Sequence, residues 1–532
     1  MGNKKLLRLF ALMLALVFVL GACMGCKTTA PDSGGQQSSS GQQSGDSSGD
    51  SGTKDTLTVL SAESFTGSWD PTGHTILANI HVEYVVFDSL MKTNWETMEI
   101  EPCLATEWYY LDDGATLELK LREGVTFHNG QPFTAEDVKM SIERFSEQTR
   151  VASCWWKEQV LGEVVDDYTV RLKPSSGIPY APLVNLLAFT AIMSADDIRN
   201  EERLMNSMNG TGPYKFAKFE NEQVDFVAND EYWGEKAKIP NVVFRYVADP
   251  ATRLAALQTG EADIIERVEA EQIPSIEADP NIVYSTATAI EQKNLVFKWR
   301  MPPMNEQKVR QAIAHAIDRE TIVNDIMSGY AVLADSFVSN VAWGYAPAEG
   351  YPTYDPEKAK QFLAEAGYPN GEGLPELTYF TSVGFYPKTK EYGEFIISNL
   401  ADIGIKCKLE PMETASWLDG LYQPTSGYMC DTGWMPPGAE PDLTIYAFYH
   451  SVGQVAFCED PELDEVLDKE SSLTDPDERA AYLKDVVFPL LSEKVPHMQL
   501  FNSVLIYAMR SDIRGFDPTP TSAMPFYSVY FQ

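Results

Sequence analysis

The stretch LELKLREGVTFHNG, residues 117–130, contains a strand and a turn in immediate succession. Leucines alternate with charged residues along its first five positions, which is the period-two pattern of a half-buried strand. The dipeptide Asn129-Gly130 then predicts a tight turn. The segment VDDYTVRLKP, residues 165–174, repeats the alternation, so we expect the two strands to pair.

The continuation QPFTAEDVKMSIERF, residues 131–145, predicts a helix. Thr134 is a good N-cap with Asp137 three residues later, which is the spacing at which side chains satisfy the first free N–H groups. Val138, Ile142 and Phe145 then fall on one face. Residues 117–145 therefore predict a strand–turn–helix unit with an apolar side on each element.

Similar signals recur along the rest of the chain. Asp-Pro pairs at 249–250 and 355–356 open helices that glycines at 260 and 367 close, the usual order of Pro first and Gly last. Helical periodicity also covers residues 309–317 and about 476–493, where Pro489 predicts a bend. Strand patterns occupy residues 56–60, 263–265 and 497–501. Strands and helices in alternation predict a mixed α/β fold.

The N-terminal residues 1–22 predict a secretion signal. Lys4, Lys5 and Arg8 precede an apolar run, Leu9 to Leu20, that is shorter than the roughly 20 residues needed to span a bilayer. The run ends in Leu-Gly-Ala before Cys23, which resembles a bacterial lipobox and makes Cys23 the expected lipidation site. An ordinary secreted protein is the alternative. Residues 23–55, rich in Ser, Gly and Gln, predict a flexible tether.

Composition limits the classes of function. The chain has 532 residues, 44% of them hydrophobic, and about 480 follow the tether, which favours two or more lobes because one core rarely grows past ~250–300 residues. A net charge of −36 argues against nucleic-acid binding, which needs clustered Lys and Arg. Seven cysteines are too few for a disulfide scaffold; we expect at most one bridge, Cys430–Cys458.

The chemistry expected of an enzyme is absent from the sequence. The six histidines form no zinc-binding motif, and there is no Gly-x-Ser-x-Gly elbow, phosphate-binding loop or dinucleotide fingerprint. Acidic pairs such as Asp166-Asp167 are expected by chance among 77 acidic residues. We therefore predict no enzyme activity, no cofactor and no metal site.

Several blocks, taken together, resemble a known family. FDSLM at 87–91 and the run from Pro102 to Phe145 are similar to the extracellular solute-binding proteins of family 5, the peptide-, oligopeptide- and nickel-binding components of ABC importers. Further similar blocks follow in the family's order: GTGPYKF (210–216), DPATRLAALQTGEADII (249–265), KVRQAIAHAIDRETIV (308–323), YDPEKAKQFLAEAGYPNG (354–371) and IGIKCKLEPME (403–413). The resemblance covers residues 57 to about 516.

The resemblance implies a two-lobed periplasmic-binding-protein fold, type II-like, with an extra domain in the first lobe. Lobe one is then expected at 56–296, with the extra domain at about 80–205 and completion by 500–532; lobe two is expected at 297–499. The expected protein is a monomer, held extracytoplasmically at the cell membrane by its lipid. It captures di- or oligopeptides between the lobes and delivers them to ABC permease subunits. A sensing lipoprotein and a secreted hydrolase are further alternatives.

The segment DTGWMPPGAEPDLTIYAFYHS, 431–451, faces the cleft in this family. Peptide-binding members often carry an Asp just after the Trp, which grips the peptide α-ammonium. Here no acid follows Trp434 until Glu440 and Asp442. A non-peptide ligand, such as a sugar, an opine-like conjugate or a metal chelate, therefore stays open. The expected ligand-binding residues are Trp434, Asp431, Trp299, Trp417, Phe65, Trp69, and Trp155 or Trp156, of which Trp156 is preferred.

Overall fold

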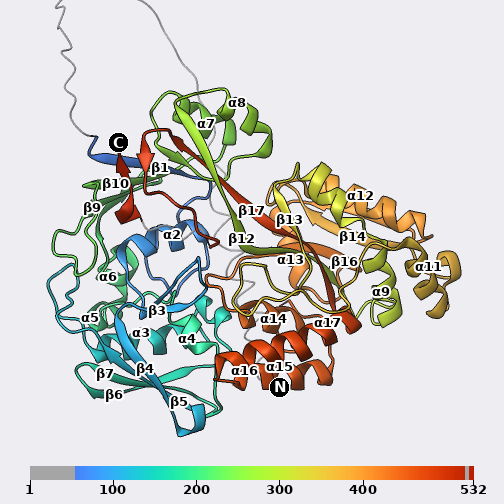
Figure 1. Ribbon diagram of the computed structural model, residues 1–532, viewed down its shortest axis with the longest axis horizontal. Helices are drawn as coiled ribbons and strands as arrows, with labels where there is room; N and C mark the ends of the chain where they lie inside the picture. The colour runs from blue at the N-terminus through green and yellow to red at the C-terminus, as the bar shows by residue number, and fades with distance from the viewer. Residues whose placement is uncertain (1–53, 454, 522–525) are drawn as a thin grey trace, which may run out of the picture. The chain divides into compact units, whose positions relative to one another are not determined.

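The computed structural model describes residues 54–453, 455–521 and 526–532 (Figure 1). Residues Thr53–Gln532 form one compact unit of mixed α/β structure, as predicted. The predicted signal, lipidation site Cys23 and tether lie outside the described residues. Within the described ranges, no helix combines the length and apolar character needed to cross a bilayer.

An eleven-stranded sheet runs through the whole unit. Its order is β15-β14-β16-β12-β17-β11-β1-β10-β9-β8, and β13 pairs with β17 outside this path. The strands are β1 (Thr56–Ser61), β8 (Tyr214–Glu220), β9 (Gln223–Ala228), β10 (Asn241–Tyr246), β11 (Ile264–Ile265), β12 (Ile282–Phe297), β13 (Ala331–Leu333), β14 (Leu377–Ser382), β15 (Cys407–Met412), β16 (Met429–Trp434) and β17 (His497–Arg510).

Two long strands join the two halves of this sheet. β12 and β17 are antiparallel and lie side by side across the view in Figure 1. The register shifts between Thr288 and Gln292 and again between Lys293 and Asn294. Beyond these irregularities, β12 pairs with β16 through residues 292–297. The strand predicted at 497–501 is therefore the start of a much longer one.

A separate four-stranded antiparallel sheet contains the strand of residues 117–121. Its order is β4 (Ala105–Leu111), β5 (Thr116–Leu121), β7 (Thr169–Pro174) and β6 (Val160–Asp166), so the predicted pairing of the two alternating segments is confirmed. Helix α3 (Ala135–Ser146) has the predicted cap, because Thr134 and Asp137 form a reciprocal capping box. A hairpin of β2 (Met91–Thr93) and β3 (Ile100–Pro102) precedes this sheet, and β18 (Ile513–Arg514) pairs with β19 (Tyr530–Phe531) near the C-terminus.

Helices cover the sheets. The α-helices besides α3 are α2 (Leu77–Val86), α4 (Leu183–Leu186), α5 (Ala195–Ile198), α6 (Glu201–Asn206), α7 (Pro250–Gln258), α8 (Ile273–Glu277), α9 (Gln307–Ala316), α10 (Arg319–Thr321), α11 (Pro356–Glu365), α12 (Thr389–Asp402), α13 (Thr414–Tyr422), α14 (Asp442–Tyr449), α15 (Pro461–Ser472), α16 (Pro476–Tyr482) and α17 (Phe488–Lys494). Short 3-10 helices are η1 (Asp112–Gly114), η2 (Val151–Trp155), η3 (Ala270–Gln272), η5 (Pro369–Gly371) and η7 (Phe526–Ser528); π-helical turns are η4 (Ile322–Ile326) and η6 (Leu483–Val487).

The helix predicted at about 476–493 is present as α16, the π-helical turn η6 and α17 in succession. The π-helical turn lies just before Pro489, whose missing N–H and ring disfavour a regular α-helical ladder there. One expectation about local structure needs correction. The expected Cys430–Cys458 bridge does not form. Burial raises the pKa of each thiol to about 12, and the Cys458 thiol donates to the Tyr449 carbonyl at 3.2 Å. Each cysteine is therefore a buried core thiol.

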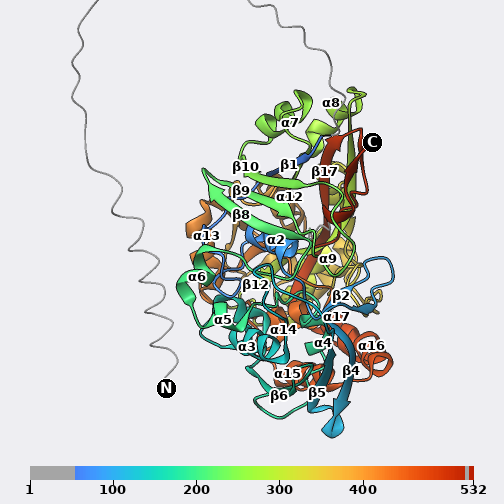
Figure 2. The same cartoon turned by 90° about the vertical axis from the view of Figure 1, so that its left-hand side faces the viewer.

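Four hydrophobic clusters form the interior. The largest joins β1, β8–β10, α2, α3 and the four-stranded sheet. Two others lie among residues 290–501, and a small one surrounds α7, α8 and β11. Figures 1 and 2 both place α15 and α16 beside the segment that carries the four-stranded sheet. The Ala181 amide donates to the Ser471 carbonyl there at 2.8 Å, so residues far apart in sequence are in direct contact.

Candidate ligand-binding site

A cavity of about 50 Å³ lies where α2, η2 and the residues after β16 meet. It is reached from the loop after β1 through Pro71 and His74, and from the other side through Pro437. Six of its fifteen lining residues are Phe, Tyr or Trp: Tyr84, Phe87, Phe145, Trp155, Trp156 and Phe189. Ligand sites in proteins are typically apolar hollows with a few placed polar groups, and this lining has that composition, but the cavity is smaller than the roughly 300–1,000 Å³ of most ligand pockets.

An aromatic contact closes the cavity on one side. The rings of Trp155 and Trp434 lie edge to face with centroids 5.2 Å apart, and Trp434 packs in the same way on Phe448 at 5.6 Å. The Trp434 indole N–H donates to the Leu443 carbonyl at 2.8 Å, which fixes the ring. Trp155, which lines the cavity, therefore connects η2 to Trp434 at the end of β16.

The polar groups of the cavity come from a histidine–glutamate pair. His74 Nε2 lies 2.8 Å from Glu83 Oε1, and both side chains are buried. Burial lowers the pKa of His74, but the Glu83 carboxylate outweighs it and leaves this pKa above its ordinary value. Among the described residues His74 Nδ1 has no hydrogen-bond partner, so one ring nitrogen is available to a ligand.

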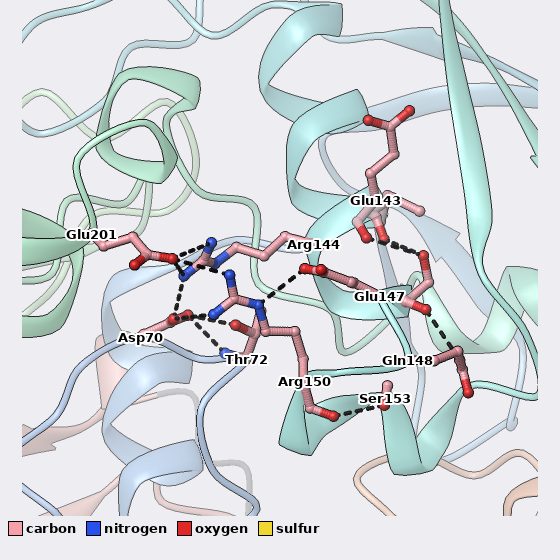
Figure 3. A network of polar contacts seen from close by, with 11 residues as sticks. Asp70, Thr72, Glu143, Arg144, Glu147, Gln148, Arg150, Ser153 and Glu201 are labelled. Carbon is pink, nitrogen blue, oxygen red and sulfur yellow. Dashed lines mark hydrogen bonds and ion pairs between the residues drawn. The ribbon is translucent and has the colours of Figure 1, made fainter. Parts of the chain in front are cut away.

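A buried charge network holds this part of the site in place (Figure 3). Asp70 Oδ1 accepts from the Thr72 amide and hydroxyl at 3.0 and 2.8 Å, and Asp70 Oδ2 lies 2.6 Å from Arg144 Nη2. Arg144 and Arg150 share Glu201 Oε1, which is 3.1 Å from Arg150 Nη2. The Ala152 amide then donates to the Thr72 carbonyl at 3.2 Å. The network thereby ties the loop carrying His74 to η2, which carries Trp155.

A polar group of side chains lies on the neighbouring strands. Asp431 on β16 is fully buried and contacts the Tyr392 hydroxyl, and burial raises the pKa of its carboxyl. The Trp417 indole donates to the Asp431 carbonyl at 3.1 Å. Trp417 is itself buried beneath Phe385 and Tyr386. These residues therefore support the end of β16 that leads to Trp434.

The residues predicted to bind ligand lie in three different places in the structure. Trp156, together with Trp155, lines the cavity, and Trp434 contacts it through Trp155. Asp431 and Trp417 lie in the adjacent polar group. The other three pack elsewhere: Phe65 and Trp69 against Phe219, and Trp299 beneath the Arg310 guanidinium at 3.6 Å.

Sequence reasoning missed His74 and Glu83. They lie nine positions apart on either side of a helix start, and only the fold brings them together. His74 precedes a helix in an unremarkable turn sequence, so no motif marked it.

The first acids after Trp434 are already bound within the protein. Glu440 receives two hydrogen bonds from Arg479 and one from Asn185, and Arg479 also holds Glu470 at 2.7 Å. Asp442 is buried beside them, and burial raises its pKa well above the ordinary value. Glu440 is therefore not free to grip a ligand ammonium, whereas Asp442 Oδ1 is buried without a hydrogen-bond partner among the described residues. In the part of the chain described, no group of three or more His, Cys, Asp or Glu is arranged to hold a metal ion.

Comparison with known proteins identifies the family. The sequence model of the bacterial extracellular solute-binding proteins, family 5 (middle), matches residues 99–455, and the chain belongs to this family. Its members are extracytoplasmic solute-binding proteins that work with ABC permeases, rather than enzymes. The predicted family and its fold class are confirmed.

Three similar proteins show the range of the family. Heme-binding protein A of Haemophilus influenzae is 27% identical over 84% of this chain and 86% of its own length. Glutathione-binding protein GsiB of Escherichia coli K12 is 29% identical over 82% and 87% of the two chains. The structure of periplasmic binding protein DppA from Helicobacter pylori, in complex with the peptide STSA, is 28% identical, with a TM-score of 0.74 over 90% of this chain and 98% of that one.

Proposed function

We propose that this protein captures short peptides in the cavity beside Trp155 and Trp434 and delivers them to an ABC permease. The observation that carries the proposal is the aromatic cavity that segments distant in sequence close around the His74–Glu83 pair. Aromatic rings offer broad, rigid contact to apolar side chains, and one available ring nitrogen can hydrogen-bond a peptide group. The peptide bound by the similar DppA and the glutathione named for GsiB support the same ligand class.

Trp434 and Trp156 are the residues we propose to contact the ligand directly, with Asp431 and Trp417 supporting them from behind. Phe65, Trp69 and Trp299 stay as weaker proposals, because each packs against protein groups in this structure. The proposed lobes are 56–296 with 500–532, and 297–499, with the extra domain at about 80–205. Ligand would bias the equilibrium between their open and closed arrangements.

We further propose attachment of a monomeric receptor to the outer face of the cell membrane by lipid on Cys23. The apolar run that ends at Cys23 and the Ser/Gly/Gln-rich residues 23–55 support this proposal. A tether of this composition would let the folded unit reach solvent while it stays near its permease. Mass analysis of the membrane-extracted protein would show an acylated N-terminal Cys23 if the proposal is correct.

A non-peptide ligand is the second candidate. The observation that favours it is the engagement of Glu440, the first acid after Trp434, by Arg479, together with the burial of Asp442, which raises the pKa of that carboxyl and favours its neutral form. The name of the Haemophilus influenzae relative shows that ligands in this family extend beyond peptides.

Native mass spectrometry of the chain lacking residues 1–26 tests the proposal. The described residues begin at Lys54, so this truncation keeps all of them. Denaturation in the spectrometer then releases any bound molecule. A heterogeneous set of short peptides supports peptide capture. A single non-peptide mass would overturn it and would identify the ligand class of the second candidate.

A further inference from the structure

Lys293 on β12 presents a buried amine that the protein itself does not satisfy. Its side chain is 1% exposed, and Nζ has neither a hydrogen-bond partner nor an ion pair within 4.0 Å among residues 54–453, 455–521 and 526–532. Its nearest neighbour is the Tyr386 ring, whose centroid lies 2.6 Å from Nζ. Burying an ammonium without a partner is costly, so such a group points to something outside the chain that binds it.

The nearby carboxylates do not fill this role. Glu291 Oε1 accepts from the Ser503 hydroxyl at 2.5 Å, and Asp431 Oδ2 is taken by the Tyr392 hydroxyl. Both acids act on Lys293 only through space, and burial outweighs them and lowers its pKa to about 8. The amine therefore keeps its charge at neutral pH.

Gly433 makes the space that the amine occupies. It lies opposite Lys293 in the β12–β16 register. A Cβ at this position would lie 2.8 Å from Lys293 Nζ and 2.7 Å from Glu291 Oε2. Gly433 also accepts a hydrogen bond from the Tyr386 hydroxyl at 3.1 Å, so Tyr386 covers the amine from the loop before α12. Tyr386 is only half-buried, and solvent lies beyond it.

The amine is one residue away from the aromatic site. Gly433 immediately precedes Trp434, and successive strand residues face opposite sides, so Lys293 lies on the far side of the β16 terminus from the Trp434 ring.

We propose that Lys293 binds a carboxylate of the captured ligand, so that the protein selects ligands that bear a carboxylate. This inference rests on the proposed peptide function and narrows it. The carboxylate is either the peptide C-terminus or an acidic side chain, since both present the same two acceptor oxygens. Tyr386 moves aside when the carboxylate enters.

Lys298 supplies a matched control on the same strand end. It is also fully buried, but its Nζ donates to the Gly420 and Leu421 carbonyls at 3.2 and 2.6 Å. Lys293→Met removes an unpaired charge, whereas Lys298→Met leaves two carbonyls without a donor. The two variants therefore separate a ligand-binding amine from a structural one.

In the experiment, the chain lacking residues 1–26 is incubated with an equimolar pool of tripeptides. Each tripeptide is present as the free acid and as the C-terminal amide, and half of the sequences contain a Glu side chain. Native mass spectrometry then measures which peptides stay bound. We expect the wild type to retain carboxylate-bearing peptides at least about tenfold more than amidated, Glu-free ones. Lys293→Met should lose this preference, and Lys298→Met should keep it. Retention of the Glu-bearing amides identifies a side-chain source, and their loss identifies the C-terminus.

Two results would overturn the inference. The first is retention of the fully amidated, Glu-free peptides by the wild type equal to that of the carboxylate-bearing ones, or an unchanged preference in Lys293→Met. The second result comes from melting temperatures measured without ligand. Lys293→Met should melt at or above the wild-type temperature, and Lys298→Met should melt below it. A melting temperature several degrees lower in Lys293→Met would show that the protein itself stabilises this amine. If no peptide of any form is retained, the proposed peptide function fails, and the melting result still decides whether Lys293 is a free amine.

Discussion

Replacement of Trp155 by alanine should weaken ligand binding more than it weakens the fold. Trp155 is half-buried at the end of η2, lines the cavity, and meets Trp434 edge to face at 5.2 Å. No hydrogen bond from its indole is needed for the network of Figure 3, which ends at the Ser153 hydroxyl and the Ala152 amide. The alanine variant should therefore keep η2 in place.

The expected loss follows from the apolar contact with the ligand. A ligand that covers about 80 Å² of the indole loses about 2 kcal/mol of apolar contact at about 25 cal/mol per Å². This loss corresponds to a Kd about 30-fold higher. The ring pair with Trp434 is present without ligand, so its contribution of about 1 kcal/mol is lost from the free energy of unfolding instead.

Isothermal titration with a peptide retained in the mass spectrum measures this loss. Trp108→Ala is the matched control, because Trp108 is a half-buried tryptophan of β4 that does not line the cavity. We expect the control to bind as the wild type does. A folded Trp155→Ala protein whose Kd stays within about threefold of the wild type would refute the placement of the ligand in this cavity.

Three further predictions concern the framework around the site. Asp70→Asn should lower the free energy of unfolding by about 3 kcal/mol, since it breaks a buried ion pair. Burial raises the pKa of Asp70, but its hydrogen bonds outweigh burial and hold this pKa below 3.8, so the stabilisation by the ion pair is present above pH 3.8 and is lost as the pH falls further. In urea titrations, the difference in stability between variant and wild type should therefore shrink below pH 3.8. Gly210→Ala should lower the free energy of unfolding by more than about 3 kcal/mol, because the added Cβ would lie 2.1 Å from the Val86 carbonyl oxygen. Gly124→Ala has open space around the added Cβ but a positive φ, so it should lower the free energy of unfolding by only about 1 kcal/mol. Equal melting temperatures of the two variants would contradict this prediction. Burial raises the pKa of Glu470 to about 7, so the native state keeps a proton that the unfolded chain releases near pH 4.5. The free energy of unfolding of the wild type should therefore decrease as the pH rises from about 4.5 to about 7. An equally steep decrease in Glu470→Gln would show that another group is responsible.

Local signals predicted much of the fold because they act over a few residues. The capped helix that starts after Thr134, the Asp-Pro starts of α7 and α11, and the pairing of β5 with β7 all follow from period, caps and turns. The length of β12 and the π-helical turn η6 did not, because strand extent and helix register are set by packing against neighbours distant in sequence.

The candidate site shows the same division. Trp434 and Trp156 were expected from the family resemblance and their aromatic character; the structure places Trp156 in the cavity lining and Trp434 against Trp155, and their contact with ligand stays a prediction. His74 and Glu83 could not, because their pairing depends on how α2 packs beneath the loop after β1. Lys293 escaped notice because a lysine in a strand is ordinarily a solvent-facing residue, and only the position of Tyr386 shows its burial.

Hydrogen exchange of the chain lacking residues 1–26, with and without a retained peptide, tests the central claim most directly. The account predicts that the peptide slows exchange at residues 70–84 and 151–156, which contribute to the cavity lining, and at residues 431–437, which lead to Trp434 and to the lining residue Pro437, and leaves the β4–β5 hairpin at residues 105–121 unchanged. Slower exchange confined to another region, or no change at saturating peptide, would contradict the claim that peptides bind between these segments.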